Sequence, residues 1–491
     1  MRVNFLRISL ATLLIGIGTG IFLYIFTKAS VSSFTHDESY TYLHYPHASF
    51  MDIVSYKGWY SNNHLLNTLF MKYSEKTFGS SETALRLPNL LLFIVYMVYG
   101  YLLFGRTCQL LAVAVFVLLC TNNLLIDLFG LARGYGMSCG FMLMSFYHFI
   151  ESFYNQKTKN LFFFHVGALF AIMSNFTLLT FYVTLLLVYN LVIFMDCKFI
   201  SNKKYNFLNS NKIHGILLLP MIVILYEPVR RVVMYNNFDY GGKNGFYSDT
   251  VTHLIFHALH GIHLSPFALV SVQILFTSIV LISFVIILRM IFKGNETFFN
   301  KFKGLIISNL LVVFISIAII LQHTIFGTDY PVARFSIFLY PIFIIHFGFL
   351  LSYFLNNGYK KVVSTVALCL ALISITSFGL KADLHSCAEW GFDMETKNML
   401  QKLTASKSSN DSDSRKTKLG INFLFEPTIN FYRQTMGIDW LLPVNRNGIT
   451  KEDDYYYIFK DELSQLNPSG YEIIVEFKRT HTLLLKNNNS R

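Results

Sequence analysis

The stretch Thr35-His36-Asp37-Glu38-Ser39-Tyr40 places two adjacent carboxylates directly after the first long apolar run of the chain. That run extends from Ile8 to about Phe26, which is long enough to cross a bilayer, and no clear small-residue cleavage site follows it. We therefore expect a retained first membrane helix. The two carboxylates then lie where this helix emerges into water, a placement that favours chemistry at a membrane surface.

The composition indicates a polytopic membrane protein. Of the 491 residues, 53% are hydrophobic and 14% are charged, and apolar runs of membrane-spanning length recur along the chain. Much of the net charge of +12 lies in short segments between these runs. This pattern orients membrane helices, so we exclude nucleic acid as a partner. The six cysteines lie mostly in apolar runs or near the expected inner face, which argues against a disulfide framework.

We predict an α-helical membrane domain over residues 1–380 and a small extracytoplasmic α/β domain over residues 381–491. The predicted spans are residues 8–30, 87–104, 109–128, 134–150, 161–174, 176–195, 214–226, 265–292, 304–322, 335–355 and 362–380. The predicted strands of the second domain are Leu419–Phe425, Trp440–Val444, Tyr455–Phe459, Tyr471–Phe477 and Thr482–Leu485, with a helix near Thr428–Met436 that Gly437 ends.

If the N-terminus lies inside, every inner segment is net basic, as the positive-inside rule requires. The outer face then collects the segments 31–86, 127–134, 227–264 and 323–334, together with the residues after Lys381. The spans themselves hold few ionisable groups, because a charge at mid-bilayer costs roughly 2.5–3.5 kcal/mol. We therefore predict that the polar chemistry lies on one side of the membrane.

The outer segment 31–86 contains interfacial helices by its pattern. Apolar residues recur at helical spacing at Leu65, Leu66, Leu69, Phe70 and Tyr73, with Asn63, Asn67 and Lys72 elsewhere around the helix. This pattern predicts a helix lying in the membrane interface. Such a helix forms a wall of the site around Asp37, or it only anchors the chain.

Several motifs in this order resemble those of the GT-C superfamily of membrane glycosyltransferases. The motifs are His36-Asp37-Glu38-Ser39-Tyr40, Ser61-Asn62-Asn63-His64-Leu65-Leu66, Phe78–Pro88, Ala132-Arg133-Gly134-Tyr135, and Asp329–Phe335 with Tyr340-Pro341. The nearest kin by these motifs are the dolichyl-phosphate-mannose protein mannosyltransferases and the lipid A aminoarabinose transferases. The resemblance implies an inverting transfer of a sugar from a polyprenyl-phosphate-linked donor to a protein, lipid or glycan acceptor on the non-cytoplasmic face. Relatives often have a His-Pro-Pro-Leu-like stretch where this chain has Asn63-His64-Leu65-Leu66.

Asp37 is the candidate general base, which is also the position that the resemblance indicates. A lipid phosphate leaves as a stabilised anion without an acid, so one carboxylate that takes the proton of the acceptor hydroxyl is sufficient. The alternative is a helix-terminal residue at the membrane surface. Glu38 points elsewhere in any regular structure. We include it as a catalytic candidate that orients the acceptor or binds a neighbouring cation; the alternative is a solvated side chain.

The leaving phosphate needs cations. The candidates for this role on the outer face are Arg334, Arg133, Lys57, Lys243 and Arg86. For Arg334 the alternative is an arginine at a span end that reaches the interface, and for Arg133 it is a packing contact with Asp127. We interpret Arg86 as a membrane anchor.

Four further residues are assigned to the acceptor or to the cavity lining, namely Asn63, His64, Tyr135 and His257. His257 belongs to a series with His253, His260 and His263, whose spacing places several imidazoles on one helical face. A zinc site is one interpretation, but no carboxylate or cysteine accompanies these residues, so contact with phosphate or acceptor is preferred. No resident cofactor is expected, and a divalent cation is left open. The segment 239–245 is glycine-rich, which favours a loop that orders over a ligand, or a plain linker.

Two other classes of protein share this composition. A lipid-linked glycan transporter or flippase normally has broken helices and polar groups at mid-bilayer, whereas a polysaccharide polymerase or ligase uses the same kind of donor. We expect a multi-pass protein of a bacterial inner membrane with its active site on the extracytoplasmic side, in contact with membrane lipids.

Overall fold

The structure is a computed structural model. It describes residues 2–57, 62–105, 107–155, 157–197, 207–235, 240–294, 296–408, 416–450, 452–466 and 470–488. The chain forms two compact units. The helical unit comprises Met1–Ile25, Val54–Asn67 and Asn89–Ala382, and the sheet unit comprises Phe26–Ile53, Thr68–Pro88 and Asp383–Arg491.

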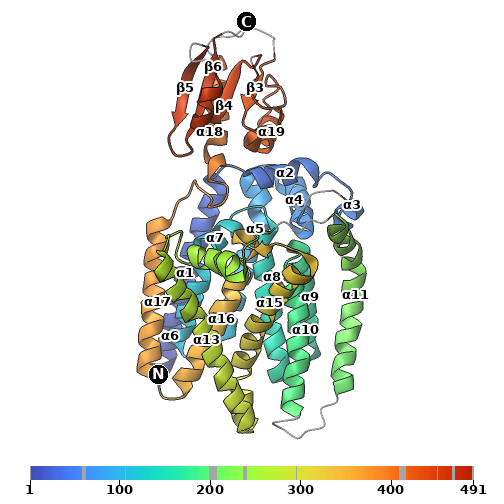
Figure 1. Cartoon of the computed structure of the whole chain (residues 1–491), viewed down its shortest axis with the longest axis vertical. Coiled ribbons are helices and arrows are strands. Elements are labelled where there is room, and N and C mark those ends of the chain that lie inside the picture. The colour runs from blue at the N-terminus through green and yellow to red at the C-terminus, as the bar shows by residue number, and fades with distance from the viewer. Residues whose placement is uncertain are drawn as a thin grey trace. The chain divides into compact units, whose positions relative to one another are not determined.

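Long helices make up the helical unit (Figure 1). They are α6 (Gln109–Cys120), α7 (Asn123–Phe129), α8 (Gly134–Asn155), α9 (Thr158–Ser174), α10 (Leu178–Met195), α11 (Phe207–Met234), α13 (Pro266–Phe292), α15 (Lys303–Phe326), α16 (Leu339–Asn356) and α17 (Lys360–Lys381). Short helices are η2 (Phe246–Val251), α12 (Thr252–Ala258), α14 (Glu296–Lys301) and η3 (Ala333–Phe335), and the strands are β1 (Gly241–Gly242) and β2 (Tyr330–Pro331). Both units receive residues from α1 (Arg2–Val31), α3 (Phe50–Val54), α4 (Leu65–Phe78) and α5 (Glu82–Phe104).

Each of the eleven predicted spans contains a helix or part of one, although some of their end residues and residues 121–122 are not helical. Among the described residues, seven helices are long and apolar enough to cross a membrane, and the pair α6 and α7 makes an eighth if it is one span. These helices define an integral membrane protein. The predicted span 109–128 is not a single helix, because α6 and α7 meet at an angle of 67°. Asn122 begins the second helix, since its side chain accepts a hydrogen bond from Leu125 N at 3.0 Å.

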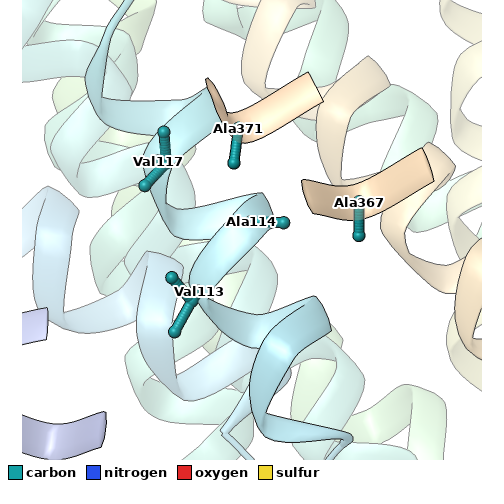
Figure 2. Close-up of a cluster of buried hydrophobic side chains, with 5 residues drawn as sticks. All are labelled: Val113, Ala114, Val117, Ala367 and Ala371. Atoms are coloured by element: carbon teal, nitrogen blue, oxygen red, sulfur yellow. The ribbon is translucent and has the colours of Figure 1, made fainter. Parts of the chain in front are cut away.

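Small residues allow the helices of the bundle to approach closely. Figure 2 shows Val113, Ala114 and Val117 of α6 against Ala367 and Ala371 of α17. Packing of this kind holds helices together in a membrane, where lipid is as apolar as leucine and burial alone gives little drive for association.

Several loops meet at one end of the helical unit. His64 contacts Ser174, which ends α9, and Gly241 contacts Asp329 from the segment between α15 and α16. His260 contacts Thr121 at the break between α6 and α7. These contacts join the predicted outer segments 227–264 and 323–334 to each other, and they place His64 of segment 31–86 beside the end of α9. The predicted loop at residue 227 begins later, because α11 continues to Met234.

The sheet unit has four strands in the order β3-β4-β6-β5, with β3 and β4 parallel and the other pairs antiparallel (Figure 1). The strands are β3 (Leu419–Ile421), β4 (Tyr455–Phe459), β5 (Tyr471–Phe477) and β6 (Thr482–Asn487). The helices of this unit are α2 (His36–His44), η4 (Gly391–Glu395), α18 (Thr396–Ser408), η5 (Phe423–Phe425), α19 (Glu426–Thr435) and η6 (Lys460–Gln465).

Two strand predictions differ from the structure. Trp440–Val444 is not a strand, and only Leu441 forms an isolated bridge, with Thr417. Pro443 explains this, because proline lacks the N–H that a ladder needs. The predicted strand Leu419–Phe425 ends early, since the Asn422 side chain accepts from Leu424 N and starts a 3-10 turn. The predicted helix near Thr428–Met436 is α19, and Gly437 follows it with a φ of 65°.

The helix predicted in the outer segment is α4. Leu65, Leu66 and Leu69 are buried, but Tyr73 is exposed, and Asn67, which the pattern places away from the apolar side, is buried. The helix is therefore packed on more than one face, because neighbouring protein covers positions that the pattern assigned to the polar side.

Part of the polar segment 405–417 is helical, because α18 continues to Ser408. Residues 409–415 of this segment lie outside the described residues.

Candidate active site

The carboxylate stretch forms the first turn of α2. Thr35 precedes this helix in an extended conformation, and its backbone N and its Oγ1 donate to Glu38 Oε2 at 2.9 and 3.0 Å. The Glu38 side chain thus returns to the residue before the helix, as in a capping box. This contact fixes the residue at which α2 begins. It therefore also fixes the position of Asp37 in the first turn of the helix.

Glu38 is bound to Arg86. Arg86 Nε donates to Glu38 Oε1 at 2.8 Å and Arg86 Nη2 donates to Glu38 Oε2 at 2.7 Å, and both side chains are fully buried. A solvated Glu38 is therefore wrong, and a direct contact with an acceptor is excluded by its burial. The predicted binding of a neighbouring cation is the role that the geometry supports.

Arg86 also holds the end of α1. Its Nη1 donates to Ala29 O at 2.9 Å and to Ser32 O at 3.0 Å, and its Nη2 donates to Ser33 O at 2.8 Å. These carbonyls lie in the last turn of α1 or directly after it, where carbonyls lack a partner within the helix. The interpretation of Arg86 as an interfacial anchor is wrong, because a buried guanidinium here joins the end of α1 to the start of α2.

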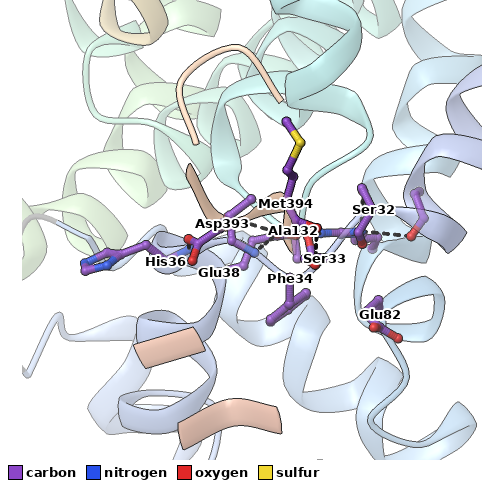
Figure 3. A network of polar contacts seen from close by, with 12 residues as sticks. Ser32, Ser33, Phe34, His36, Glu38, Glu82, Ala132, Asp393 and Met394 are labelled. Carbon is purple, nitrogen blue, oxygen red and sulfur yellow. Dashed lines mark hydrogen bonds and ion pairs between the residues drawn. The ribbon is translucent and has the colours of Figure 1, made fainter. Parts of the chain in front are cut away.

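Asp393 is a buried carboxyl that sequence reasoning missed. Its Oδ2 accepts from His36 N, the first N–H of α2, at 2.5 Å, and its Oδ1 accepts from Thr396 Oγ1 at 3.3 Å (Figure 3). Burial raises the pKa of Asp393 well above its ordinary value, and the negative charge of Asp37 acts in the same direction. No spacing rule links residues so distant in sequence, and an acidic residue between Phe392 and Met394 was the only signal.

Asp37 lies in the first turn of α2, beside Glu38 in the sequence. Unlike Glu38 and Asp393, it is partly exposed. The neighbours of Asp37 thus fix the backbone that carries it, while the Asp37 side chain keeps access to solvent.

Glu82 explains a second motif of the outer segment. It accepts from Lys397 Nζ at 2.5 Å and from Tyr432 Oη at 3.0 Å, and Tyr432 Oη accepts from Phe34 N at 2.7 Å. The motif with Glu82 and Arg86 is therefore structural in this unit, since both charged groups hold the segment before α2 in place.

A second cluster lies in the helical unit and is made of His64, Arg133, Tyr135, Arg334 and Phe335. We call it the arginine cluster. The His64 ring lies 4.6 Å from the Tyr135 ring, and the Tyr135 ring lies 5.8 Å from the Phe335 ring, centroid to centroid. Residues from three separate motifs are thereby brought together, two of them predicted for the donor phosphate (Arg133 and Arg334) and two for the acceptor or cavity lining (His64 and Tyr135).

The two arginines stack on the aromatic rings of this cluster. The guanidinium carbon of Arg133 lies 5.8 Å from the Tyr135 centroid and that of Arg334 lies 5.0 Å from the Phe335 centroid. Arg133 is buried and its Nη1 donates to Asn62 O at 3.0 Å, whereas Arg334 is half-buried. Ala333 has a φ of 46°, which a residue with a Cβ adopts at a cost of about 1–3 kcal/mol. Strain of this kind is typical of functional sites.

His64 is held as a neutral hydrogen-bond acceptor. Its Nδ1 donates to Ser174 O at 2.8 Å. A carbonyl oxygen only accepts, so the hydrogen of the neutral ring lies on Nδ1 and Nε2 presents a lone pair. Burial, followed by the positive charge of Arg133 and to a smaller extent that of Arg334, holds the pKa of His64 well below its ordinary value.

The glycine-rich loop is anchored beside this cluster. Gly241 pairs with Pro331 and Gly242 pairs with Tyr330, and the Tyr240 ring packs 5.4 Å from the Phe335 ring. Inside the loop, the Asp249 carboxylate accepts from Asn244 N at 2.7 Å and from Gly245 N at 3.2 Å. Burial alone raises the pKa of Asp249, but these hydrogen bonds hold it below its ordinary value. Asp239, also part of the prediction, lies outside the described residues.

The remaining predicted site residues lie on segments around these loops. Lys57 and Lys243 are exposed, Asn63 is buried, and His257 on α12 is half-buried. Burial lowers the pKa of His257 to about 4, and the neighbouring His253 contributes to the shift. Across the described part of the chain, no group of three or more His, Cys, Asp or Glu side chains is placed to hold a metal ion.

An apolar groove of about 500 Å³ runs along α10 and α15. Val183 and Leu187 line it from α10, and Phe314 and Ile317 line it from α15. Its polar end is at Gln322, whose Nε2 donates to Thr180 Oγ1 at 2.9 Å. Because Gln322 lies in the last turns of α15, this end is the one from which the chain continues to Arg334.

Comparison with known proteins gives the class of the fold. No protein-family model matches the chain, and no curated protein matches its sequence. Its structure is similar to that of ArnT from Cupriavidus metallidurans in the apo state, with a TM-score of 0.54, 10% identity and 97% of each chain covered. The same protein bound to undecaprenyl phosphate gives a TM-score of 0.53, 10% identity and 98% of each chain. The oligosaccharyltransferase of Archaeoglobus fulgidus gives 0.47 and 12% identity over 85% of this chain and 63% of that one.

The chain therefore has the fold of the GT-C membrane glycosyltransferases, as its motifs predicted. A structure of this fold that is similar over 97% of the chain is that of ArnT from Cupriavidus metallidurans.

Proposed function

We propose that the protein is an inverting membrane glycosyltransferase that moves a sugar from a polyprenyl phosphate to a hydroxyl acceptor. The observation that carries the proposal is the arginine cluster, in which Arg133 and Arg334 are held close to a neutral His64. Two guanidinium groups in one cluster suit a phosphate, to which arginine donates in pairs. ArnT was observed with undecaprenyl phosphate, which supports a donor of the same chemical class here.

The groove between α10 and α15 is the place that we assign to the polyprenyl tail. Its lining is almost entirely apolar, and it lies on helices that are long and apolar enough to span a bilayer. A tail in this groove has its phosphate toward the Gln322 end, from which the chain leads to Arg334. Long apolar tails contribute about 0.8 kcal/mol of binding free energy for each buried CH₂ group. In this proposal the groove provides most of the affinity for the lipid, and the arginines fix the position of its phosphate.

In the proposed reaction, the Asp37 carboxylate accepts the proton of the acceptor hydroxyl while that oxygen attacks the anomeric carbon. The bond from this carbon to the phosphate oxygen breaks, its electron pair stays on the phosphate, and the configuration inverts. Arg334 and Arg133 stabilise the charge that develops on the phosphate. Glu38 is a positioning residue, since it touches Thr35 and Arg86 rather than a substrate.

We further propose that the reaction takes place on the extracytoplasmic side of a bacterial inner membrane, with residues 381–491 outside the bilayer. Lys57 and Lys243 then guide the phosphate from exposed positions, and Asn63, Tyr135 and His257 line the path of the acceptor.

The proposal is tested with the full-length protein, wild type and variants, expressed in cells that lack it. We expect mass spectrometry of lipid-linked sugars and surface glycans to show one glycan that depends on the wild-type protein. Asp37→Asn removes this glycan, because loss of a general base lowers the rate about 10²–10⁴-fold, while leaving the expression level and the binding of undecaprenyl phosphate unchanged. Lys460→Gln, which removes an exposed ion pair with Glu476, is the matched control and keeps the glycan. An Asp37→Asn protein with full activity disproves the assignment of the base.

A further inference from the structure

We propose that His64 is a specificity-determining residue whose Nε2 accepts a hydrogen bond from a hydroxyl group of the donor's sugar. This inference rests on the proposed function, because it assumes that Arg133 and Arg334 bind the phosphate next to that sugar.

The hydrogen-bond chemistry of His64 is defined by its partner. Nδ1 donates to Ser174 O at 2.8 Å, which leaves Nε2 as the acceptor of the neutral ring. The side chain is only 6% exposed, and its Nε2 has no hydrogen-bond partner among the described residues. A buried acceptor without a partner is unfavourable, so a ligand that donates to it gains affinity.

The His64 ring has little freedom to turn. Gly134 passes so close that a Cβ at this position would overlap Ser174 O and lie 2.8 Å from His64 Cβ and Cγ. Tyr135 packs edge-on against the ring, with the centroids 4.6 Å apart. The imidazole is thus wedged between two segments of the bundle and presents Nε2 in a single direction.

The electrostatic surroundings decide what Nε2 can bind. The positive charge of Arg133 and Arg334 opposes protonation of the ring, so His64 stays a neutral acceptor at neutral pH. A phosphodiester carries no proton at that pH and therefore has nothing to donate. The sugar on that phosphate does carry donors, in its hydroxyl groups. The two kinds of side chain therefore have different roles. The arginines bind the phosphate, and His64 binds the sugar attached to that phosphate.

Two substitutions separate this role from a structural one. In His64→Asn the side-chain amide N–H retains the bond to Ser174 O, but nothing replaces Nε2. In His64→Gln the longer side chain places an amide oxygen near the position of Nε2. The probe is the pool of polyprenyl phosphates, with and without sugar, extracted from membranes of the source cells. Each full-length protein is immobilised in detergent, incubated with this pool and eluted, and the bound lipids are counted by mass spectrometry.

We expect the wild-type protein to retain sugar-bearing lipids in preference to bare polyprenyl phosphate. His64→Asn reduces this preference about tenfold, the loss of one hydrogen bond, and retains bare polyprenyl phosphate as the wild type does. His64→Gln restores the preference. If His64→Asn does not elute as a folded protein, His64→Gln carries the test alone, and loss of the preference in it overturns the proposal.

The other outcomes distinguish the two levels of inference. A wild-type protein that retains neither kind of lipid disproves the proposed function together with the role of His64. A His64→Asn protein with the wild-type preference overturns only the role of His64, as does one that loses both kinds of lipid, since a contact to sugar has no effect on bare phosphate.

Discussion

The pairing of Glu38 with Arg86 shows how two neighbouring carboxylates can have different roles. Sequence reasoning found both residues and the motif around them, but adjacency alone does not tell which one is buried. The partner of Glu38 lies 48 residues away, and only the fold brings the two together. Asp37 is predicted from its position after the first apolar run, whereas the role of Glu38 is decided by the structure.

We expect Glu38→Gln to destabilise the protein strongly. The substitution leaves the Arg86 guanidinium buried without its counter-charge, a loss that costs about 3–5 kcal/mol in comparable pairs. Thermal unfolding of the purified protein measures it. The control is Arg446→Gln, whose ion pair with Glu426 is partly exposed, and which we expect to change stability by less than about 1 kcal/mol. Equal effects of the two substitutions contradict the structural role of Glu38.

Asp393 makes a prediction about pH. Its pKa is raised in the folded state, so the protonated form is favoured by folding and its stabilisation is fully present below the unfolded value of about 3.9. As the pH rises through the higher folded value, that stabilisation is lost. We expect Asp393→Asn to be less sensitive to rising pH than the wild type when unfolding is followed from about pH 4 to about pH 8. Parallel curves for the two proteins refute this assignment.

At the scale of elements, the helices follow from periodicity and length, whereas the bend between α6 and α7 does not. The apolar run continues through residues 109–128, and only the polar pair Thr121 and Asn122 interrupts it. The contacts of the glycine-rich loop do not follow from its composition either. Glycine favours flexibility, but the Asp249 carboxylate and the pairing with β2 hold this loop. Short-range composition does not reveal such partners.

Gly134 determines whether α8 can pack beside His64. A Cβ at this position overlaps the backbone oxygen of Ser174. We therefore expect Gly134→Ala to lower the free energy of unfolding by more than the about 1–3 kcal/mol typical of one extra methyl group in a packed core. Gly20→Ala is the control, because its Cβ would meet nothing within 4 Å. Unfolding midpoints of the two variants are compared in the same detergent, and similar midpoints rule out the close approach.

At the scale of the whole molecule, the class of fold was predictable from the order of weak motifs along the chain. The arginine cluster was predictable in its members but not in its geometry. Arg133, Arg334 and His64 come from distant segments. Nothing in the sequence states that these three side chains pack against the rings of Tyr135 and Phe335. The number of spans is harder to predict, since α8, α9 and α11 are helical but lie outside the set of long apolar helices.

The groove along α10 and α15 gives a prediction for the lipid as a whole. Ala318→Trp fills it from α15, so we expect weaker retention of undecaprenyl phosphate but unchanged retention of a short-chain isoprenyl phosphate. Val270→Trp, on an exposed position of α13, is the control and changes neither. Equal retention of the long lipid by Ala318→Trp and the wild type shows that the tail lies elsewhere.

The bend between α6 and α7 has a consequence for movement. Thr121 O at the bend accepts from His260 Nε2 at 2.8 Å, and Ser377 Oγ donates to His260 Nδ1 at 2.8 Å. Exposure of a backbone carbonyl group to hydrocarbon inside a bilayer is unfavourable. The segment after α12, which carries His260, therefore has to stay in place over the bend. Any gating that admits substrate has to come from other segments, because lifting this one would uncover the gap in the helix.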